Sequence, residues 1–284
     1  MRHCLIITAY RDLTILNRLI GRTPADWGVF VHLDRKSEIR PEAVAPRARV
    51  FSWERIQWGS ARHLRCIVRL LDEASRAGEW DYYHIVSGAD YFAVAPSRFD
   101  DLLGTSGKNY ISCTHLPCKG WAWGEGLDIF RYAELSEYVD IRKRFWKNLN
   151  RLFVGGQRLL HLGKKLPGYE LYRGLIYSSL HKTFIRWVLQ DGFADDLLCR
   201  LRHAVVPEEV YLQTLIMNSP FRDTVVNNNL RYDDWSAPVP PGDLDMSHYQ
   251  RILASGKLFC RKVKTGFSDA LMNALDAYND SDGQ

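Results

Sequence analysis

The sequence lacks the long apolar segments that export signals and membrane anchors require. No window of its 284 residues approaches the roughly 20 apolar residues of a membrane-spanning helix. The first apolar run is followed by polar residues within a few positions, so we expect a buried strand there and neither a signal peptide nor an anchor. These absences predict a cytoplasmic protein.

Motifs of several common enzyme classes are also missing. The six cysteines form no C-x-x-C pair, which disfavours zinc ribbons and thioredoxin chemistry. No G-x-G-x-x-G follows the first apolar run, and neither a P-loop nor a G-x-S-x-G is present, so dinucleotide, phosphoryl-transfer and serine-hydrolase readings gain no support. No two of the nine histidines have metal-ligand spacing. The net charge of +5 is modest, and we expect no nucleic-acid partner.

The first part of the chain alternates between short apolar runs and helical patterns. We predict strands at Cys4–Ala9, Gly28–Leu33, Arg49–Ser52 and Tyr82–Val86, and helices at Leu13–Ile20 and Ser60–Ala77. Such alternation is typical of an α/β domain in which helices flank a largely parallel sheet. Ligands bind beyond the carboxyl ends of these strands, which places residues 8–10, 32–34 and 87–90 at a candidate site.

A pair of carboxylates opens a later helical pattern. Pro207 suits the first turn of a helix, and Glu208 and Glu209 follow it directly. The apolar spacing from Val210 onward predicts a helix that holds this turn in place, so one of the two carboxylates could act as a general base. Alternatively, both acids only complement the helix dipole and cap free N–H groups.

Six segments in order resemble one known family. They are HLDRKS (32–37), QWGS (57–60), YYHIVSGADY (82–91), PEEVYLQTL (207–215), NLRYDDW (229–235) and KLFCRKV (257–263). Together they resemble the core-2/I-branching N-acetylglucosaminyltransferase and xylosyltransferase family, in a bacterial form. Residues 116–172 show no clear resemblance.

The resemblance implies a single-domain, inverting glycosyltransferase of the A-type fold, which uses a UDP-sugar of the GlcNAc or xylose type and no divalent metal. The domain is expected at residues 1–278, with a nucleotide-sugar half (1–115) and an acceptor and catalytic half (116–278). Residues 279–284 are polar and lack an apolar anchor, so we expect them to fray. By the same resemblance Glu209 is the base, and Glu208 is left for capping or for acceptor contact.

In this family basic side chains stabilise the leaving diphosphate, and Lys262 matches the family lysine. The family's second basic residue has no clear counterpart here, which leaves Arg231, Arg251 or Arg261 as substitutes. The only D-x-D, Asp243–Asp245, lies in a Pro-Gly loop, and we interpret it as the cap of a helix that starts at Ser247.

The remaining site residues also follow from the resemblance. On the donor side they are Ala9, Tyr10, Asp34, Trp58, Gly88 and Asp90, and on the acceptor side Tyr177, Tyr232 and Trp235. By themselves, Trp58 could be a core residue and Asp90 could cap a turn. Two alternative functions stay open: a transferase of the same fold with another nucleotide-sugar, and an inactive protein that binds a glycan or nucleotide.

A basic stretch at residues 141–166 stands apart from these motifs. Between Asp140 and Glu170 the chain has eight Lys or Arg residues and no acid. Aromatic and apolar residues recur there at helical spacing, and Gly155-Gly156 predicts a break between two helices. Such a pair could lie on an anionic membrane at the inner face of the cell and bring the enzyme to a lipid-linked glycan, or it could be an ordinary packed helix with a solvated basic side.

Overall fold

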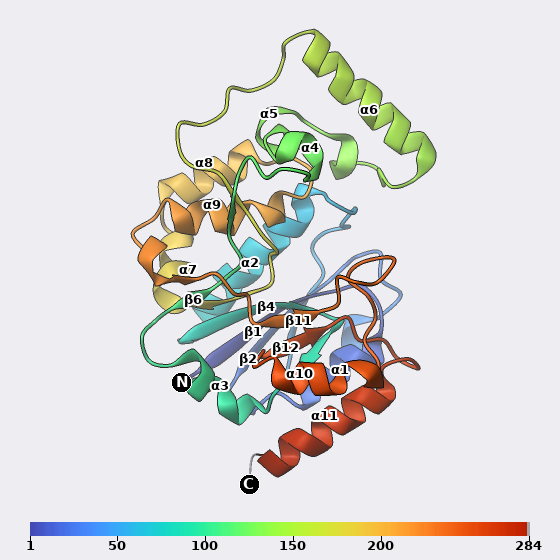
Figure 1. Ribbon diagram of the computed structural model, residues 1–284, viewed down its shortest axis with the longest axis vertical. Coiled ribbons are helices and arrows are strands. Elements are labelled where there is room, and N and C mark those ends of the chain that lie inside the picture. The colour runs from blue at the N-terminus through green and yellow to red at the C-terminus, as the bar shows by residue number, and fades with distance from the viewer. Residues whose placement is uncertain (283–284) are drawn as a thin grey trace.

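The computed structural model, which describes residues 1–282, is organised around a seven-stranded sheet (Figure 1). In spatial order the strands are β10 (Val225–Val226), β6 (Asn109–Tyr110), β9 (Ser178–His181), β4 (Tyr82–Ser87), β1 (His3–Ala9), β2 (Gly28–Leu33) and β3 (Arg49–Phe51). Strands β4, β1, β2 and β3 are parallel, whereas β9 is antiparallel to both β4 and β6. The predicted α/β architecture with a mostly parallel sheet is confirmed, and β9 makes the sheet mixed.

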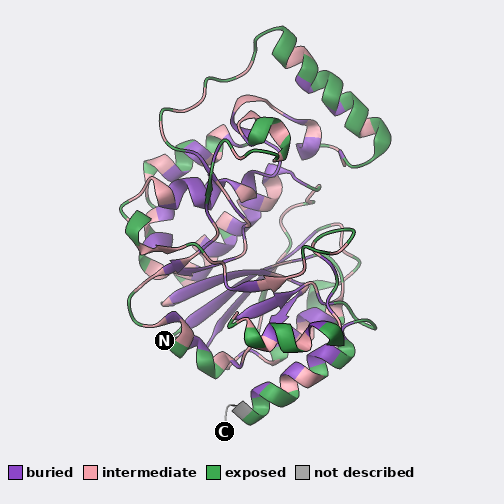
Figure 2. Cartoon of the chain, in the orientation of Figure 1, coloured by how far each residue is buried: buried purple, intermediate pink, exposed green. Residues whose placement is uncertain are grey.

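Helices cover both faces of this sheet. One face packs against α2 (Ala61–Ala77), α7 (Lys182–Val188), α8 (Gly192–Arg200) and α9 (Tyr211–Met217), and the other against α1 (Leu13–Gly21), α3 (Phe99–Leu103), α10 (Tyr249–Ala254) and α11 (Asp269–Asp282). Strand β1 shows why two layers are needed, because Cys4 and Ile6 enter one core while Leu5 and Ile7 enter the other. Figure 2 shows its ribbon buried along nearly its whole length. A strand that is apolar on both faces must be covered on both.

A smaller sheet joins the C-terminal part of the chain to the end of β4. It consists of β11 (Arg231–Asp233), β12 (Phe259–Arg261) and β5 (Asp90–Phe92), with β12 parallel to β11 and antiparallel to β5. A third sheet pairs β7 (Thr114–His115) with β8 (Tyr172–Arg173). The halves that we expected on either side of residue 115 therefore share sheets, since β9 pairs with β4 and β12 pairs with β5.

The last helix continues beyond residue 278, where we expected the ordered domain to end. Helix α11 extends to Asp282, and the Asn279 side chain is buried. Ion pairs hold α11 to α1 and to Arg22, the residue that follows it: Arg18 Nη2 lies 2.7 Å from Asp276 Oδ2, Arg22 Nε lies 3.3 Å from Asp276 Oδ1, and Arg22 Nη2 lies 2.5 Å from Asp280 Oδ1. Polar residues thus anchor a segment that lacks apolar anchors; residues 283–284 lie outside the described part.

The basic segment also differs from its prediction. Helix α6 (Arg144–Leu159) passes through Gly155 and Gly156 without the expected break. The Gln157 side chain fixes this part of the helix, because its Oε1 accepts a hydrogen bond from Ala133 N (3.0 Å) and its Nε2 donates one to Ala133 O (2.8 Å). Two short helices, α4 (Ala122–Glu125) and α5 (Asp128–Arg131), precede α6. Within residues 1–282, no helix has both the length and the apolarity needed to cross a membrane.

Gly174 allows a close approach that positions the Pro207–Glu209 turn. Its N–H donates to Glu209 O (2.8 Å), and a Cβ at this position would lie 1.8 Å from Ser112 O. We therefore expect Gly174→Ala to lower the free energy of unfolding by about 2 kcal/mol or more, measured by urea denaturation. Gly192→Ala is the control, because an added Cβ there meets nothing within 4 Å. It should change the free energy of unfolding by less than about 0.5 kcal/mol, or raise it. Equal effects of the two substitutions would contradict this account.

Candidate active site

A cavity of about 1070 Å³ opens beyond the carboxyl ends of β1, β2 and β4. Its floor includes Thr8, Asp34 and Ser87, one from the end of each strand. The 3-10 turn Pro207–Glu209 (η4) and a loop that contains Trp235 form other walls. The carboxyl edge of a parallel sheet is where such folds bind ligands, so the cavity is the candidate site.

The fold gathers most of the predicted site residues in this cavity. Those that line it are Ala9, Tyr10, Asp34, Trp58, Tyr177, Glu208, Glu209, Trp235, Arg261 and Lys262. Gly88, Asp90, Arg231 and Tyr232 are not among the lining residues. Segments far apart in the sequence therefore converge at one place, and four predicted residues lie outside the cavity lining.

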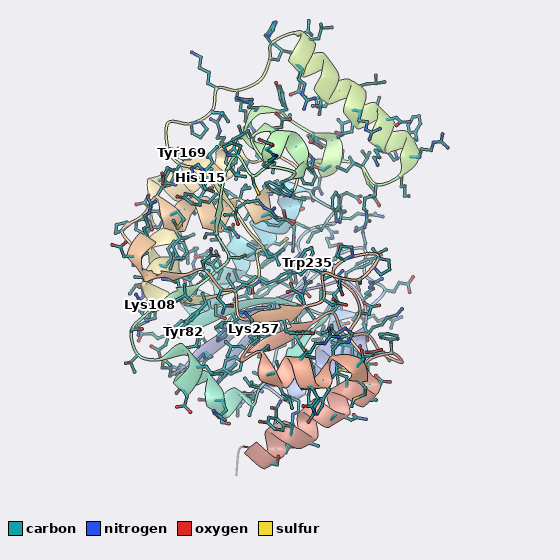
Figure 3. All side chains as sticks on the ribbon, in the orientation of Figure 1. Tyr82, Lys108, His115, Tyr169, Trp235 and Lys257 are labelled. Carbon is teal, nitrogen blue, oxygen red and sulfur yellow. The ribbon has the colours of Figure 1, made fainter. Side chains whose placement is uncertain are left out.

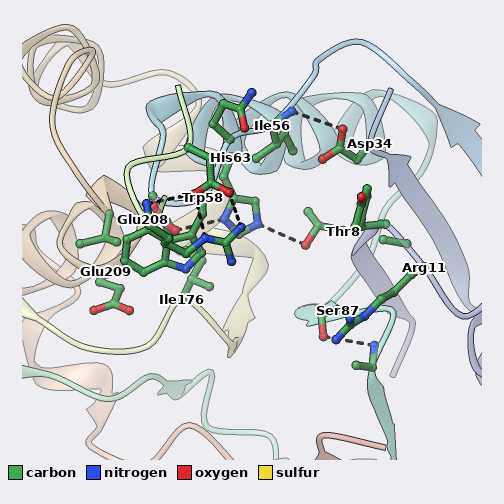
Figure 4. Close-up of a pocket in the computed structure, with 18 of the residues that line it drawn as sticks. Thr8, Arg11, Asp34, Ile56, Trp58, His63, Ser87, Ile176, Glu208 and Glu209 are labelled. Atoms are coloured by element: carbon green, nitrogen blue, oxygen red, sulfur yellow. Dashed lines mark hydrogen bonds and ion pairs between the residues drawn. The ribbon is translucent and has the colours of Figure 1, made fainter. Parts of the chain in front are cut away.

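The η4 turn is anchored at its start and at Glu208. Val206 precedes it in a left-handed conformation (φ 41°), and its N–H donates to Gly59 O at 2.8 Å. Glu208 Oε1 lies 3.2 Å from His63 Nδ1, and His63 Nε2 lies 3.2 Å from Thr8 Oγ1 (Figure 4). These contacts hold Glu208, which is only 9% exposed, against α2 and the end of β1. His63 belongs to no motif, and only its place on the first turn after the QWGS segment hints at a site role.

Glu209 has a different environment from its neighbour. No side chain in residues 1–282 donates a hydrogen bond to its carboxylate, which lines the cavity. Burial, and then the charge of the nearby Glu208, raise the pKa of Glu209 to about 7, and Arg173 opposes the shift. A carboxylate with a pKa near neutrality can accept a proton and release it again at that pH, as a general base must.

Cationic side chains line another part of the same cavity. The Arg261 guanidinium lies 3.8 Å from the Tyr177 ring centroid, and Nε lies 3.4 Å from Asp90 Oδ1. Next to it, burial and then the charge of Arg261 hold the pKa of Lys262 below its ordinary value, and Arg11 contributes to the same shift. In Figure 4, Arg11 lies on the side of the cavity opposite Glu209. Neighbouring cations with no anion between them favour the binding of one.

Asp90 is the carboxylate that pairs with Arg261 in this group of cations. Its Oδ2 accepts hydrogen bonds from Ser87 N (2.7 Å) and from the Ser87 hydroxyl, while Oδ1 faces Arg261. Gly88 belongs to the same turn, and a Cβ there would lie 3.0 Å from Ala9 Cβ. Both residues therefore shape the site without lining it.

Arg231 lies in the core and not in the cavity. Its guanidinium donates to Ile85 O (3.1 Å), Ser178 O (2.8 Å) and Ser179 Oγ (2.8 Å), which ties β11 to β4 and β9. Burial lowers its pKa to about 9. With its donors directed at these partners, Arg231 has a structural role, and of the substitutes named from the sequence Arg261 lies in the cavity.

The rim of the cavity carries exposed aromatic rings. Trp58 faces the Arg142 guanidinium at 5.8 Å, and Tyr10 lies 5.3 Å from Lys36 Nζ. Trp235 lies on the loop after β11 (Figure 3) and is more than half exposed. Exposed rings at a cavity can stack on a nucleobase or pack against the C–H face of a sugar. Tyr232 instead packs near His248, with 6.5 Å between ring centroids.

The D-x-D segment has the structural role expected from its position. Asp245 Oδ1 accepts a hydrogen bond from Ser247 N at 3.0 Å and forms the N-cap of a 3-10 turn, Met246–His248. Asp243 and Asp245 do not line the cavity. Across residues 1–282, no group of three or more His, Cys, Asp or Glu side chains is arranged to hold a metal ion.

Comparison with known proteins assigns this architecture to a family. The sequence pattern of the core-2/I-branching enzymes matches residues 6–254, which is most of the chain. The chain belongs to the core-2/I-branching enzyme family. It is similar to xylosyltransferase 1 of Rattus norvegicus (24% identity, covering 88% of this chain and 32% of the relative) and of Mus musculus (24%, 95% and 29%). A xylosyltransferase of Ciona intestinalis is similar at 24% identity, with 94% of this chain and 32% of the relative covered.

The family match covers some of the residues that line the cavity and not others. The chain spans about a third of the length of these relatives. The family match includes Asp34, Glu208 and Glu209 but ends before Arg261 and Lys262.

The raised pKa of Glu209 has a consequence for stability. In the unfolded chain this carboxyl titrates near its ordinary value of 4.5, and in the folded protein near 7. Between these two pKa values the folded protein binds more protons than the unfolded chain, so the free energy of unfolding falls as pH rises from about 4.5 to about 7. Above pH 7 we expect Glu209→Gln to have a free energy of unfolding about 2 kcal/mol higher than wild type, with allowance for partial exposure. The difference should vanish below about pH 4.5.

Urea denaturation across this pH range measures the difference. Glu170→Gln is the control, because Glu170 is exposed and a hydrogen bond from Tyr172 lowers its pKa, so its substitution should bring no gain above pH 7. A Glu209→Gln protein that is no more stable than wild type at pH 8 would show that this carboxylate carries no burial penalty.

Proposed function

We propose that the protein is an inverting, metal-independent glycosyltransferase of the A-type fold that moves a sugar of the GlcNAc or xylose type from a UDP-sugar to a glycan hydroxyl. One observation carries the proposal. A partner-free carboxylate with a pKa near 7, Glu209, shares a cavity with the cations Arg261, Lys262 and Arg11. Family membership and the similarity to xylosyltransferases support the class of reaction.

Glu209 supplies the base for the transfer. As the acceptor oxygen attacks the anomeric carbon, Glu209 takes the hydroxyl proton, the new C–O bond forms, and the C–O bond to UDP breaks on the opposite face. The transition state has oxocarbenium character, as in glycoside hydrolysis. One carboxylate is sufficient, because the leaving group departs as an anion and needs no acid.

The cations stabilise the charge that develops on the diphosphate. Lys262 and Arg261 project from the end of β12, and Arg11 follows β1. Fixed positive charge inside a cavity stabilises a leaving anion without further rearrangement. Arg261 supplies the planar guanidinium that suits phosphate oxygens, and Asp90 and Tyr177 fix its orientation. Arg11 adds a cation that the sequence motifs do not reveal.

The remaining wall residues divide between the two substrates. Asp34 Oδ1 accepts hydrogen bonds from Lys36 N (2.9 Å) and Ile56 N (3.3 Å), whereas Oδ2 has only the Lys36 ammonium group at 3.7 Å and can also accept from a ribose hydroxyl or a base N–H. Tyr10 and Trp58 flank that position on the donor side. We assign Trp235 and Tyr177, which also line the cavity, to the sugar acceptor, and Glu208 holds the η4 turn through His63.

Glu209→Gln should lower kcat by about 100-fold or more while the Kd for UDP stays within about twofold of wild type. Wild-type kcat/KM should fall below about pH 7 as Glu209 takes up a proton. Glu208→Gln is the matched control and should lose less activity, since its role is to position the turn. Steady-state kinetics and calorimetry with UDP measure both. Full activity of Glu209→Gln together with an inactive Glu208→Gln would reverse the assignment.

Lys262→Ala should weaken binding of UDP by about 10-fold or more and leave binding of uridine unchanged, because only UDP carries the diphosphate. Lys264→Ala removes an exposed charge two residues away that does not line the cavity, and should leave both affinities unchanged. Transfer should persist in EDTA. An absolute requirement for manganese or magnesium would rule out a diphosphate site built from side chains alone.

A further inference from the structure

Helix α6 presents three lengthwise stripes with different partners. Trp146, Asn150, Val154 and Gln157 form a stripe toward the protein body, Phe145, Leu149, Leu152 and Leu159 form a second, and Arg144, Lys147, Arg151 and Arg158 form a third. Residues three or four apart share one side of a helix, so each stripe is continuous. We call them the packed, apolar and basic stripes.

The packed stripe is held largely by polar groups. Asn150 Oδ1 accepts a hydrogen bond from Leu135 N (2.8 Å), and its Nδ2 donates to Glu134 Oε2 (2.9 Å). Gln157 makes two further hydrogen bonds with the backbone of Ala133. Val154 is the buried apolar residue of this stripe. The helix is therefore attached to the fold by its amides, and its large apolar side chains are not needed for that attachment.

The apolar stripe faces away from the fold. Phe145 is 69% exposed, Leu152 is 73% exposed and Leu159 is 79% exposed, and Leu149 is also in the exposed class. Leu160 and Leu162 extend this surface beyond the helix. Figure 2 shows most of α6 exposed, at the end of the molecule away from α11. A contiguous exposed apolar surface of this kind marks a place where another apolar phase binds.

The basic stripe borders the apolar one. For Arg144, Lys147 and Arg151, no carboxylate in residues 1–282 lies within ion-pair distance, whereas Arg158 pairs with Asp128 at 2.5 Å. Residues 141–169 contain no acid at all. The surface thus combines exposed apolar side chains with uncompensated positive charge, the combination that anionic lipid bilayers bind.

We propose that α6 attaches the protein reversibly to an anionic membrane, lying in the interface with its apolar stripe inserted among the acyl chains. The helix has 16 residues and four basic side chains, so it is too short and too charged to span a bilayer. A second copy of this chain would oppose the same positive charges. A soluble polyanion would pair with the basic stripe and leave the apolar stripe in water.

The attachment places the cavity next to the lipid surface. Lys143 and Trp146, at the N-terminal end of α6, line the cavity. An enzyme held by this helix therefore has its cavity near the bilayer, which suits a lipid-linked glycan as acceptor. This last step rests on the proposed function, whereas membrane attachment does not.

Co-sedimentation with vesicles tests the attachment without any measurement of activity. At low salt, wild type should pellet with phosphatidylcholine vesicles that contain about 30 mol% phosphatidylglycerol. It should pellet much less with vesicles of pure phosphatidylcholine, or at about 0.5 M salt. A triple variant Arg144→Gln, Lys147→Gln, Arg151→Gln should lower the partition coefficient by about 10-fold or more. A second variant, Phe145→Ser, Leu149→Ser, Leu152→Ser, should lose binding to a similar extent because it removes the inserted surface.

The control variant removes the same charge elsewhere. Arg40, Arg76 and Arg186 are exposed on other elements, so changing all three to Gln should leave vesicle binding near wild type. Each variant is first shown to bind UDP and to unfold at the wild-type temperature; one that does not is replaced by its single substitutions. Three outcomes would overturn the proposal: wild type that stays in the supernatant at low salt, an α6 variant that pellets like wild type, or self-association without lipid that the Ser variant abolishes.

Discussion

The burial of β1 between two parallel neighbours is the constraint on which the rest of this structure depends. Because β1 pairs with β2 and β4 and is apolar on both faces, helices must cover both sides, and the carboxyl ends of the three strands must meet at one edge. Thr8, Asp34 and Ser87 reach the cavity for that reason. The wall residues from the second part of the chain are added to an edge that the first 90 residues already define.

Within that cavity, the protein keeps opposite charges on separate walls. Glu208 is held by His63, and burial together with the charge of Glu208 raises the pKa of Glu209. On the other side, burial and the neighbouring Arg261 lower the pKa of Lys262. Neither wall neutralises the other, so each stays available to a substrate group of the opposite character. Keeping these charges unpaired lowers the free energy of unfolding of the empty protein, and the same unpaired charges are what a bound substrate can use.

The strands and α-helices expected in the first 90 residues agree with the structure to within one residue at each bound, because their apolar patterns are regular, whereas the 3-10 turn Pro41–Ala43 has no such pattern and is not predicted. It fails where local hydrogen bonds decide the structure. Gly155 and Gly156 would break an isolated helix, yet Gln157 and Ala133 hold α6 continuous. The arginines of the small sheet could not be told apart either, since Arg231 and Arg261 both lie on short strands whose register puts them on the same face of that sheet. Only their tertiary contacts show that Arg231 bonds to the backbone of β4 and β9 whereas Arg261 lines the cavity. His63 and Arg11 carry no motif and enter the site through tertiary contacts alone.

The antiparallel pairing of β12 with β5 holds one cation of the cavity independently of the loop that leads to β12. The register places Arg261 opposite Asp90, and this pairing fixes Arg261 whatever path the chain takes to reach the strand. Lys262 depends on that path, because Gly242 O accepts a hydrogen bond from Lys262 N (3.3 Å) and Lys262 O accepts one from Leu244 N (2.8 Å). Insertions or deletions in residues 236–243 would therefore move Lys262 while Arg261 stays in place. By contrast, a one-residue shift inside β12 would turn Arg261 to the opposite face of its sheet. Two neighbouring charges are in this sense held separately, one by strand register and the other by a loop.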